Sequence, residues 1–538
     1  MRASISFLIL LLCFVSFVYA QNSMPIENFK GGIVERERTK LLEGLVEKMK
    51  AGASKPKERS SKSKNIILQK IEFSQVEILP QSFFEDIKKK YENTQVGIED
   101  IYAIVDSINN EYMLKGYIAC HAFLLEQDIT SGNLFISIVE GLVSEVKISG
   151  HKTTSENYIK RYLHFENISN FNANTANTEI LKFNAENDAK ARIALSPGRV
   201  FGTSIVDIVL DEPNRYSMSA SIDNAGQKET GLTRYGGYVV VRSITRYRDI
   251  FNIGGVFSEA SNAVFTSYEI PEPFLGTRIG IGFDYSDNEI ISGGLEALNV
   301  NGRYYNVSLY SKKPFFIRDT TVTNFTLTVN TKKGESFISS FKTQDTKTDA
   351  VSLSADNTLL FSWGYLFNSL SYYQGFRLIE GDTVFEKASY YGETLINIYK
   401  TIAANIKARG QYGADIVPSS EQFSIGGINT IRGYREGMLS GRDAISANIE
   451  ILYDLPLRKF KFAAFRLYAF FDFGIVYPDK NANLPDDYDN KLYSAGGGLK
   501  LNILKHIDAN IVYAAPLLEH KYYESNKYSI LFMIQGKI

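Results

Sequence analysis

From Tyr216 to Ile538 the chain shows no helical periodicity and is predicted to form strand after strand, separated by turns. Apolar and polar residues alternate with a period of two, the period at which side chains point to opposite faces of a β-strand. The same alternation runs from Ile396 to Arg409. The apolar faces of two further segments are Ile445, Ala447, Ile449, Ile451 and Tyr453, and Leu467, Ala469, Phe471 and Phe473; the opposite faces are Ser446, Asn448, Glu450 and Asp454, and Arg466, Tyr468, Phe470 and Asp472.

A soluble β-sandwich and a membrane β-barrel both give such alternation. The barrel is favoured because one alternating pattern extends over about 320 residues, and because 33 Tyr and 35 Phe residues, many at strand ends, are typical of aromatic girdles. Strands of about 9–11 residues with their turns take roughly 20 residues each, which predicts 16 strands. The predicted fold is therefore mainly β, with a 16-stranded antiparallel transmembrane barrel over residues 214–538. A barrel of this size encloses a channel, so some segment is expected to fill it.

Two copies of a small mixed domain precede the predicted barrel. Residues 66–141 and 142–213 each show a strand, two helices and two strands, with a repeat period of about 70 residues. One helix face in the first copy carries Ile101, Ile104, Val105, Ile108 and Tyr112 at helical spacing. The order predicts two βααββ domains.

The first 65 residues carry three further signals. Arg2 and the apolar run that follows predict a secretory signal peptide over residues 1–20. Residues 21–50 predict an amphipathic helix that could plug the channel; the alternative is an ordinary segment facing solvent. Residues 51–65 are rich in Lys and Ser and predict a flexible linker. The apolar face of the candidate plug helix consists of Leu41, Leu42, Leu45, Val46 and Met49.

Composition and motifs argue against several function classes. The 59 Lys and Arg residues balance 60 Asp and Glu residues, so nucleic-acid binding is disfavoured. No phosphate-binding G-x-x-x-x-G-K-[S/T] pattern occurs, so no nucleotide motor is expected. The five His residues show no metal-ligand spacing, and no nucleophile motif appears. We therefore expect no catalytic residue, no metal site and no cofactor, and the chain is not predicted to be an enzyme.

The most specific sequence lies in a long interruption between strands, residues 413–443. It contains S-E-Q-F-S-I-G-G from Ser420 and then Ile431, Arg432, Gly433 and Tyr434. A later strand carries Phe470, Asp472 and Gly474 in the pattern F-x-D-x-G, and L-S-P-G begins at Leu195 in the second small domain. With these motifs the chain resembles the outer-membrane transporters of two-partner secretion (TpsB type, haemolysin/haemagglutinin secretion and activation), within the POTRA plus β-barrel superfamily. Ile431 stands where the family motif has Val.

The resemblance implies a plug helix, a linker, two POTRA domains and a 16-stranded barrel whose long loop folds back into the lumen. It also implies a location in the outer membrane of a Gram-negative bacterium, with the POTRA domains in the periplasm. The expected partner is a large secreted β-helical exoprotein, of adhesin or haemolysin type, recognised through its N-terminal secretion domain and exported without a nucleotide motor. Outer-membrane lipid and the barrel-assembly machinery are the other expected partners.

Within this framework, Asp472 is expected to point into the lumen, on the face opposite Phe471 and Phe473. Arg432 can reach it there, because a guanidinium matches a carboxylate with a planar fork and would anchor a glycine-flanked loop tip. A partly hydrated lumen predicts that breaking this pair has an intermediate effect. The alternative function is an outer-membrane barrel assembly factor (insertase), which would share the Arg-Gly-Tyr loop; two POTRA domains and a plug helix favour secretion.

Overall fold

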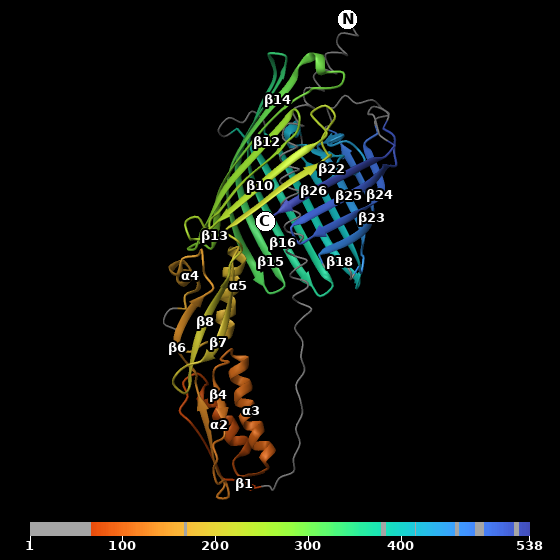
Figure 1. Cartoon of the computed structure of the whole chain (residues 1–538). Coiled ribbons are helices and arrows are strands. Elements are labelled where there is room, and N and C mark those ends of the chain that lie inside the picture. Colours follow the sequence, from red (N-terminus) through yellow and green to blue (C-terminus); the bar gives the residue numbers. More distant parts are fainter. Residues whose placement is uncertain are drawn as a thin grey trace. The chain divides into compact units, whose positions relative to one another are not determined.

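The computed structural model describes residues 66–165, 169–377, 384–414, 416–457, 462–478, 489–520 and 527–538. The described chain divides into two compact units, one ending at Pro213 and one beginning at Asn214 (Figure 1). The predicted signal peptide, plug helix and linker, including Leu41, Leu42, Leu45, Val46 and Met49, lie outside the described residues.

The first small domain packs two helices with a three-stranded sheet, in the order β2-β5-β4, and a separate two-stranded sheet, β1-β3. Helix α3 begins after Gly97, whose N–H donates to the Asp100 side chain, and it ends before Gly116, where φ is +88°. Its predicted apolar face is buried in the domain core. A short strand, β3, separates the helices and pairs with β1; the βααββ prediction had omitted it. The elements are β1 Ile66–Leu68, β2 Lys70–Phe73, α2 Gln81–Tyr91, β3 Thr94–Val96, α3 Ile98–Leu114, β4 His121–Phe123 and β5 Asn133–Val139.

The second small domain has the predicted order of one strand, two helices and two strands. Asn172 caps helix α5 by accepting hydrogen bonds from the N–H groups of Asn174 and Thr175. Tyr158 and Phe183 lie in the core between the helices and the sheet. The elements are β6 Leu142–Ser149, α4 Glu156–Leu163, α5 Ala173–Glu186, β7 Lys190–Pro197 and β8 Thr203–Asp211. None of the described helices is long and apolar enough to cross a membrane.

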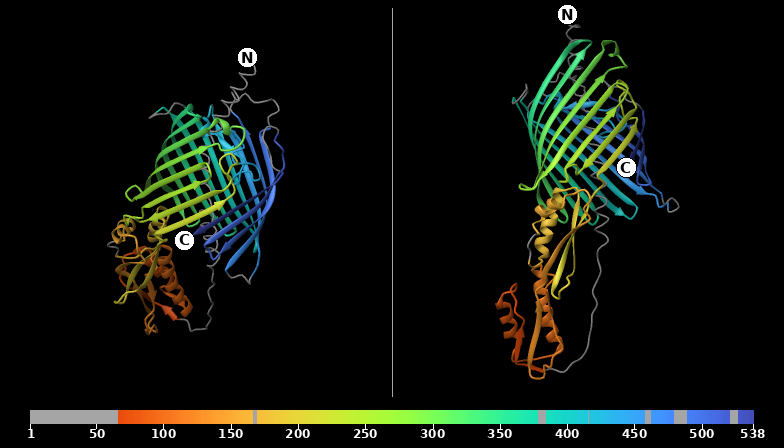
Figure 2. Two further views of the ribbon diagram at one scale, coloured as in Figure 1. Left: turned by 45° about the horizontal axis from the view of Figure 1, so that its top comes forward. Right: turned by 60° about the vertical axis from the view of Figure 1, so that its left-hand side comes forward.

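The second unit is a closed barrel, which Figure 2 shows from two further directions. Each of its 16 strands in the described ranges pairs antiparallel with its neighbours in the ring, and β26 pairs with β9 to close it. The prediction of a 16-stranded antiparallel barrel is confirmed. The strands are β9 Tyr216–Asp223, β10 Arg234–Arg242, β11 Ile250–Phe257, β12 Ser261–Glu272, β13 Thr277–Glu289, β14 Val300–Arg318, β15 Thr321–Ile338, β16 Phe341–Phe361, β17 Gly364–Phe376, β18 Glu386–Tyr399, β19 Ile402–Gly413, β22 Asp443–Asp454, β23 Ala463–Tyr477, β24 Lys491–Ile503, β25 Ile507–Pro516 and β26 Ser529–Lys537.

The burial pattern of the strands distinguishes a membrane barrel from a soluble sandwich. Ile445 and Ile451 on β22 are 49% and 47% exposed, whereas Asn448 and Glu450 on the opposite face are buried. A soluble sheet would bury the apolar face instead. The polar faces therefore line the lumen, and the apolar faces form the outer wall that contacts lipid.

Two details of the strands differ from the sequence-based expectation. Strands β14, β15 and β16 have 19, 18 and 21 residues, about twice the length needed to cross a membrane. The alternating run from Ile396 to Arg409 is not one strand, because β18 ends at Tyr399 and β19 begins at Ile402. The apolar residues on the two sides of the turn are an even number of positions apart, so the alternation continues through the turn. The sequence pattern therefore does not show where β18 ends and β19 begins.

Candidate functional site

The long segment between β19 and β22 folds onto the inner face of the barrel wall. After the short helix η2 (Ser419–Glu421), β20 (Phe423–Ile425) and β21 (Leu439–Gly441) pair as a hairpin that lies against β23. We call residues 414–442 the lumen loop. Its apolar side chains are buried against residues of β22, β23 and β24 on the inner face. The packed set is Ile425, Ile431, Tyr434, Met438, Leu439, Ala444, Val476 and Leu492.

Arg432, at the tip of the lumen loop, is clamped by two carboxylates of the barrel wall. Its Nε and Nη2 each donate to one oxygen of Asp472 at 2.7 Å, and its backbone N–H donates to the same carboxylate at 3.1 Å. Nη1 donates to Glu450 on β22 at 2.6 Å. This is the two-pronged geometry that makes arginine–carboxylate pairs strong and directional.

Neighbouring wall residues complete the charge balance around this pair. Asn448 donates to Asp472 at 2.9 Å and also to the Thr430 carbonyl of the loop. Lys500 donates to the second oxygen of Glu450 at 2.9 Å. Two cations therefore face two anions, which is the condition for keeping such groups out of water.

The cluster is also shielded from water. Asp472 is 0% and Arg432 6% exposed, and the Arg432 guanidinium carbon lies 3.6 Å from the centre of the Phe470 ring. The expectation of a partly hydrated pair is therefore wrong, because the loop and the ring cover it. The free-energy cost of breaking this pair should therefore be that of a buried ion pair.

The two motif glycines allow the loop to approach the wall closely. Gly433 has φ +94°, a conformation that favours glycine. A Cβ added at Gly474 would lie 3.0 Å from Ile425 and 3.1 Å from Ile431, closer than ordinary contact. Ile431 itself is fully buried on this surface. The sequence had singled out both glycines, and the structure brings Gly474 directly beneath the loop.

The loop tip also contacts both sides of the closure between β26 and β9, which the sequence did not reveal. The Gly433 carbonyl accepts a hydrogen bond from Ser529, the first residue of β26, at 3.0 Å. The Tyr434 hydroxyl accepts from the Leu518 N–H at 3.1 Å, two residues after the end of β25. On the other side, Gln227 in the β9–β10 connection donates to the Glu436 carbonyl at 3.1 Å.

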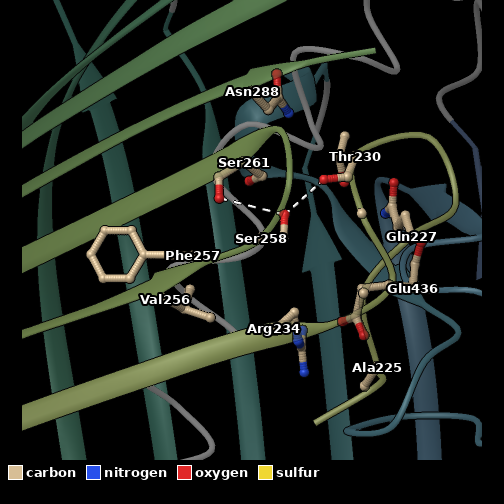
Figure 3. A pocket seen from close by; sticks show the side chains of 12 residues that line it. Ala225, Gln227, Thr230, Arg234, Val256, Phe257, Ser258, Ser261, Asn288 and Glu436 are labelled. Carbon is tan, nitrogen blue, oxygen red and sulfur yellow. Dashed lines mark hydrogen bonds between the residues drawn. The ribbon is translucent and has the colours of Figure 1, made fainter. Parts of the chain in front are cut away.

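Beside this contact lies a small cavity of about 40 Å³. Figure 3 shows Glu436 and Arg234 facing it, with Ser258 hydrogen-bonded to Thr230 and Ser261. The volume admits a water or two, whereas ligand pockets usually exceed about 300 Å³. Among the described residues no group of three or more His, Cys, Asp or Glu side chains could hold a metal ion. The arrangement fastens the lumen loop to the barrel wall.

Residues 202–501 match the family "Haemolysin secretion/activation protein ShlB/FhaC/HecB". The chain belongs to this family. Residues 66–141 match the POTRA domain of ShlB type, the range that the sequence repeat had given for the first small domain.

Curated relatives agree over most of the chain. The heme/hemopexin transporter protein HuxB of Haemophilus influenzae is 24% identical over 485 residues, covering 83% of this chain and 84% of that protein. The outer membrane transporter CdiB of Dickeya dadantii is 23% identical over 399 residues, covering 70% of each. Among solved structures, CdiB from Escherichia coli matches with a TM-score of 0.72 at 18% identity, covering 96% of this chain and 98% of that one.

The family assignment confirms the predictions of a two-partner secretion transporter, of its location in the outer membrane and of periplasmic POTRA modules. A transporter of this family acts with a secreted exoprotein partner. The assembly protein BamA from Haemophilus ducreyi shares the fold, with a TM-score of 0.56 at 13% identity over 88% of this chain and all of that one. The family match favours the secretion transporter over the assembly factor.

Proposed function

We propose that the lumen loop is the moving part of the export channel and that its docked position depends on the Arg432 cluster. The observation that carries this proposal is the bidentate contact of Arg432 with the fully buried Asp472. A loop lying against the inner wall occupies channel space that an exported chain needs. The loop would have two positions, docked and displaced, and passing from one to the other would break the Arg432 ion pairs. An exported protein could then open the channel without a nucleotide motor.

We further propose that the POTRA domains recognise the partner by adding a strand. In the described part of the chain, β2 and β4 are the edges of one three-stranded sheet and β6 and β7 are the edges of another. An extended segment can pair with such an edge through backbone hydrogen bonds. The partner we expect is a large β-helical exoprotein of adhesin or haemolysin type, bound through its N-terminal secretion domain.

The remaining expectations form part of the same proposal. The chain acts as a channel without catalysis, cofactor or nucleic acid, its outer wall contacts outer-membrane lipid, and the barrel-assembly machinery inserts it. Residues 21–50, which lie outside the described residues, are the candidate plug of the channel. Folding of the emerging passenger supplies direction.

A co-expression experiment tests this function. A host lacking related systems would express the chain together with the large exported protein encoded beside its gene, and the culture medium would be assayed for that protein. Export should require the chain and should be lost when residues 66–141 are excised, while the barrel still inserts and migrates as a heat-modifiable band. Undiminished partner binding by the truncated protein would refute recognition by the first POTRA domain and favour the assembly-factor alternative.

A further inference from the structure

A second buried ion-pair cluster lies at the foot of the lumen loop. Glu421, the last residue of η2, is 3% exposed. Its Oε1 lies 2.8 Å from Lys332 Nζ on β15, and its Oε2 lies 2.9 Å from Lys387 Nζ on β18. The two lysine side chains are themselves only 11% and 10% exposed. Each carboxylate oxygen therefore has its own buried ammonium group.

The backbone at the same position is fixed as well. The Glu421 carbonyl accepts hydrogen bonds from Lys387 Nζ at 2.8 Å and from Gln411 Nε2 at 3.0 Å. The same Gln411 nitrogen donates to the Arg442 carbonyl at 3.0 Å. Glu421 lies where the loop leaves β19 and Arg442 where it rejoins β22, so the two legs of the loop are held together at the wall.

A carboxylate this deeply buried is stable only where cations meet it, since an unpaired buried charge is strongly unfavourable. In the ring of strands, β16 and β17 separate β15 from β18. The Glu421 carboxylate therefore connects two strands that are not neighbours, and the foot of the loop can sit only where both lysines converge.

The two anchors of the loop have opposite polarity. At the tip the loop supplies the cation, Arg432, and the wall supplies anions; at the foot the loop supplies the anion, Glu421, and the wall supplies cations. A loop displaced along the wall would bring like charges together, which is unfavourable. The arrangement thus fixes the position of the loop as well as its attachment.

We propose that Glu421 is a positioning residue. With Lys332 and Lys387 it forms a second anchor, which holds the foot of the loop when the ion pairs of Arg432 with Asp472 and Glu450 break. The tip then pivots about a fixed foot and the loop stays in the barrel. This inference concerns the loop of the proposed function. It is tested on the purified full-length transporter without a partner, so its failure is distinguishable from a failure of export.

The test is amide hydrogen exchange, read by mass spectrometry, in detergent-solubilised protein whose heat-modifiable migration shows an intact barrel. Glu421→Gln keeps the shape of the side chain but removes its charge, so amides of residues 419–425 should exchange at least tenfold faster, with little change at residues 430–436. Arg432→Met should give the reverse pattern. Lys333→Met is the matched control, because Lys333 lies next to Lys332 in the sequence but pairs with Glu335, at 3.0 Å, and not with Glu421. This control should leave the exchange of both regions unchanged.

A charge-reversed variant separates charge pairing from packing. Combining Glu421→Lys with Lys387→Glu and Lys332→Met recreates one pair of opposite orientation, and protection of residues 419–425 should return. If Glu421→Gln prevents barrel assembly, Lys332→Met is used in its place. This variant keeps Lys387 paired with Glu421, so it should accelerate exchange at the foot by a smaller factor. Unchanged exchange at the foot in these variants, or a reversed pair as unprotected as Glu421→Gln, would overturn the proposal.

Discussion

Replacing Arg432 by Met should release the tip of the lumen loop while leaving the barrel intact. The substitution keeps much of the apolar stem but removes the guanidinium, which makes three side-chain hydrogen bonds to Asp472 and Glu450. Both carboxylates are buried, and only Glu450 retains a cation, Lys500. Asp472 is left as an uncompensated buried charge.

The magnitude follows from that burial. Removing one partner of a buried ion pair costs about 3–5 kcal/mol, against about 1 kcal/mol or less for an exposed pair. At about 1.4 kcal/mol per factor of ten, the docked position should become roughly a hundred- to a few-thousand-fold less favoured. Asp472→Asn should have a smaller effect, because Arg432 keeps Glu450 and the amide can still accept one hydrogen bond.

Hydrogen exchange of residues 428–437 in the full-length transporter measures this free energy directly, because docked amides exchange only when the loop opens. Lys500→Met is a useful control, since it removes a cation of the cluster without touching the loop. It should lower protection less than Arg432→Met does. Full protection of the loop tip in Arg432→Met would refute the argument that the ion pair holds it.

Three further predictions concern packing and titration. Gly474→Ala should loosen the loop by about 1–3 kcal/mol, seen as faster exchange at Ile431, because the new methyl group lies too close to it. Burial opposes ionisation of Glu212, but hydrogen bonds from Thr153 and Thr154 outweigh it and lower the pKa of Glu212 to about 2. The second small domain should therefore lose stability as pH falls from about 4.5 towards 2, and Glu212→Gln should flatten that pH dependence, measured by circular dichroism. Burial raises the pKa of the Cys120 thiol to about 11, so it should resist iodoacetamide at pH 8 until the domain is unfolded.

The parts of the fold that repeat locally were predictable from the sequence. The alternation through β22 and β23 assigned Asp472 and Phe470 to one face, and the structure places both on the lumen side. The prediction succeeds because one face of each strand contacts lipid and the other faces a polar lumen. The alternation of apolar and polar residues therefore shows which side chains point into the lumen. The apolar face of α3 in the first POTRA domain was predictable because one side of the helix packs in the domain core and the other contacts solvent.

Contacts between distant segments were harder to predict. Lys332, Lys387 and Glu421 look like ordinary polar residues of strands and loops, and only closure of the barrel brings them together. Arg432 and Asp472 were found because two specific motifs drew attention to them. The extra length of β14–β16 was missed because an alternating pattern does not show where a strand leaves the membrane.

The most direct test of the loop mechanism is a double-mutant cycle on export, with Arg432→Met, Asp472→Asn and their combination. Secreted partner would be normalised to transporter abundance in the outer membrane. Because export is proposed to need both loop positions and each single variant removes the defined docked one, each should export poorly at near-normal abundance. The double variant should lose little more than Arg432→Met alone, because both changes remove the same contact and Glu450 keeps Lys500. Strictly multiplicative losses would show that the two residues act independently and would contradict the anchored loop.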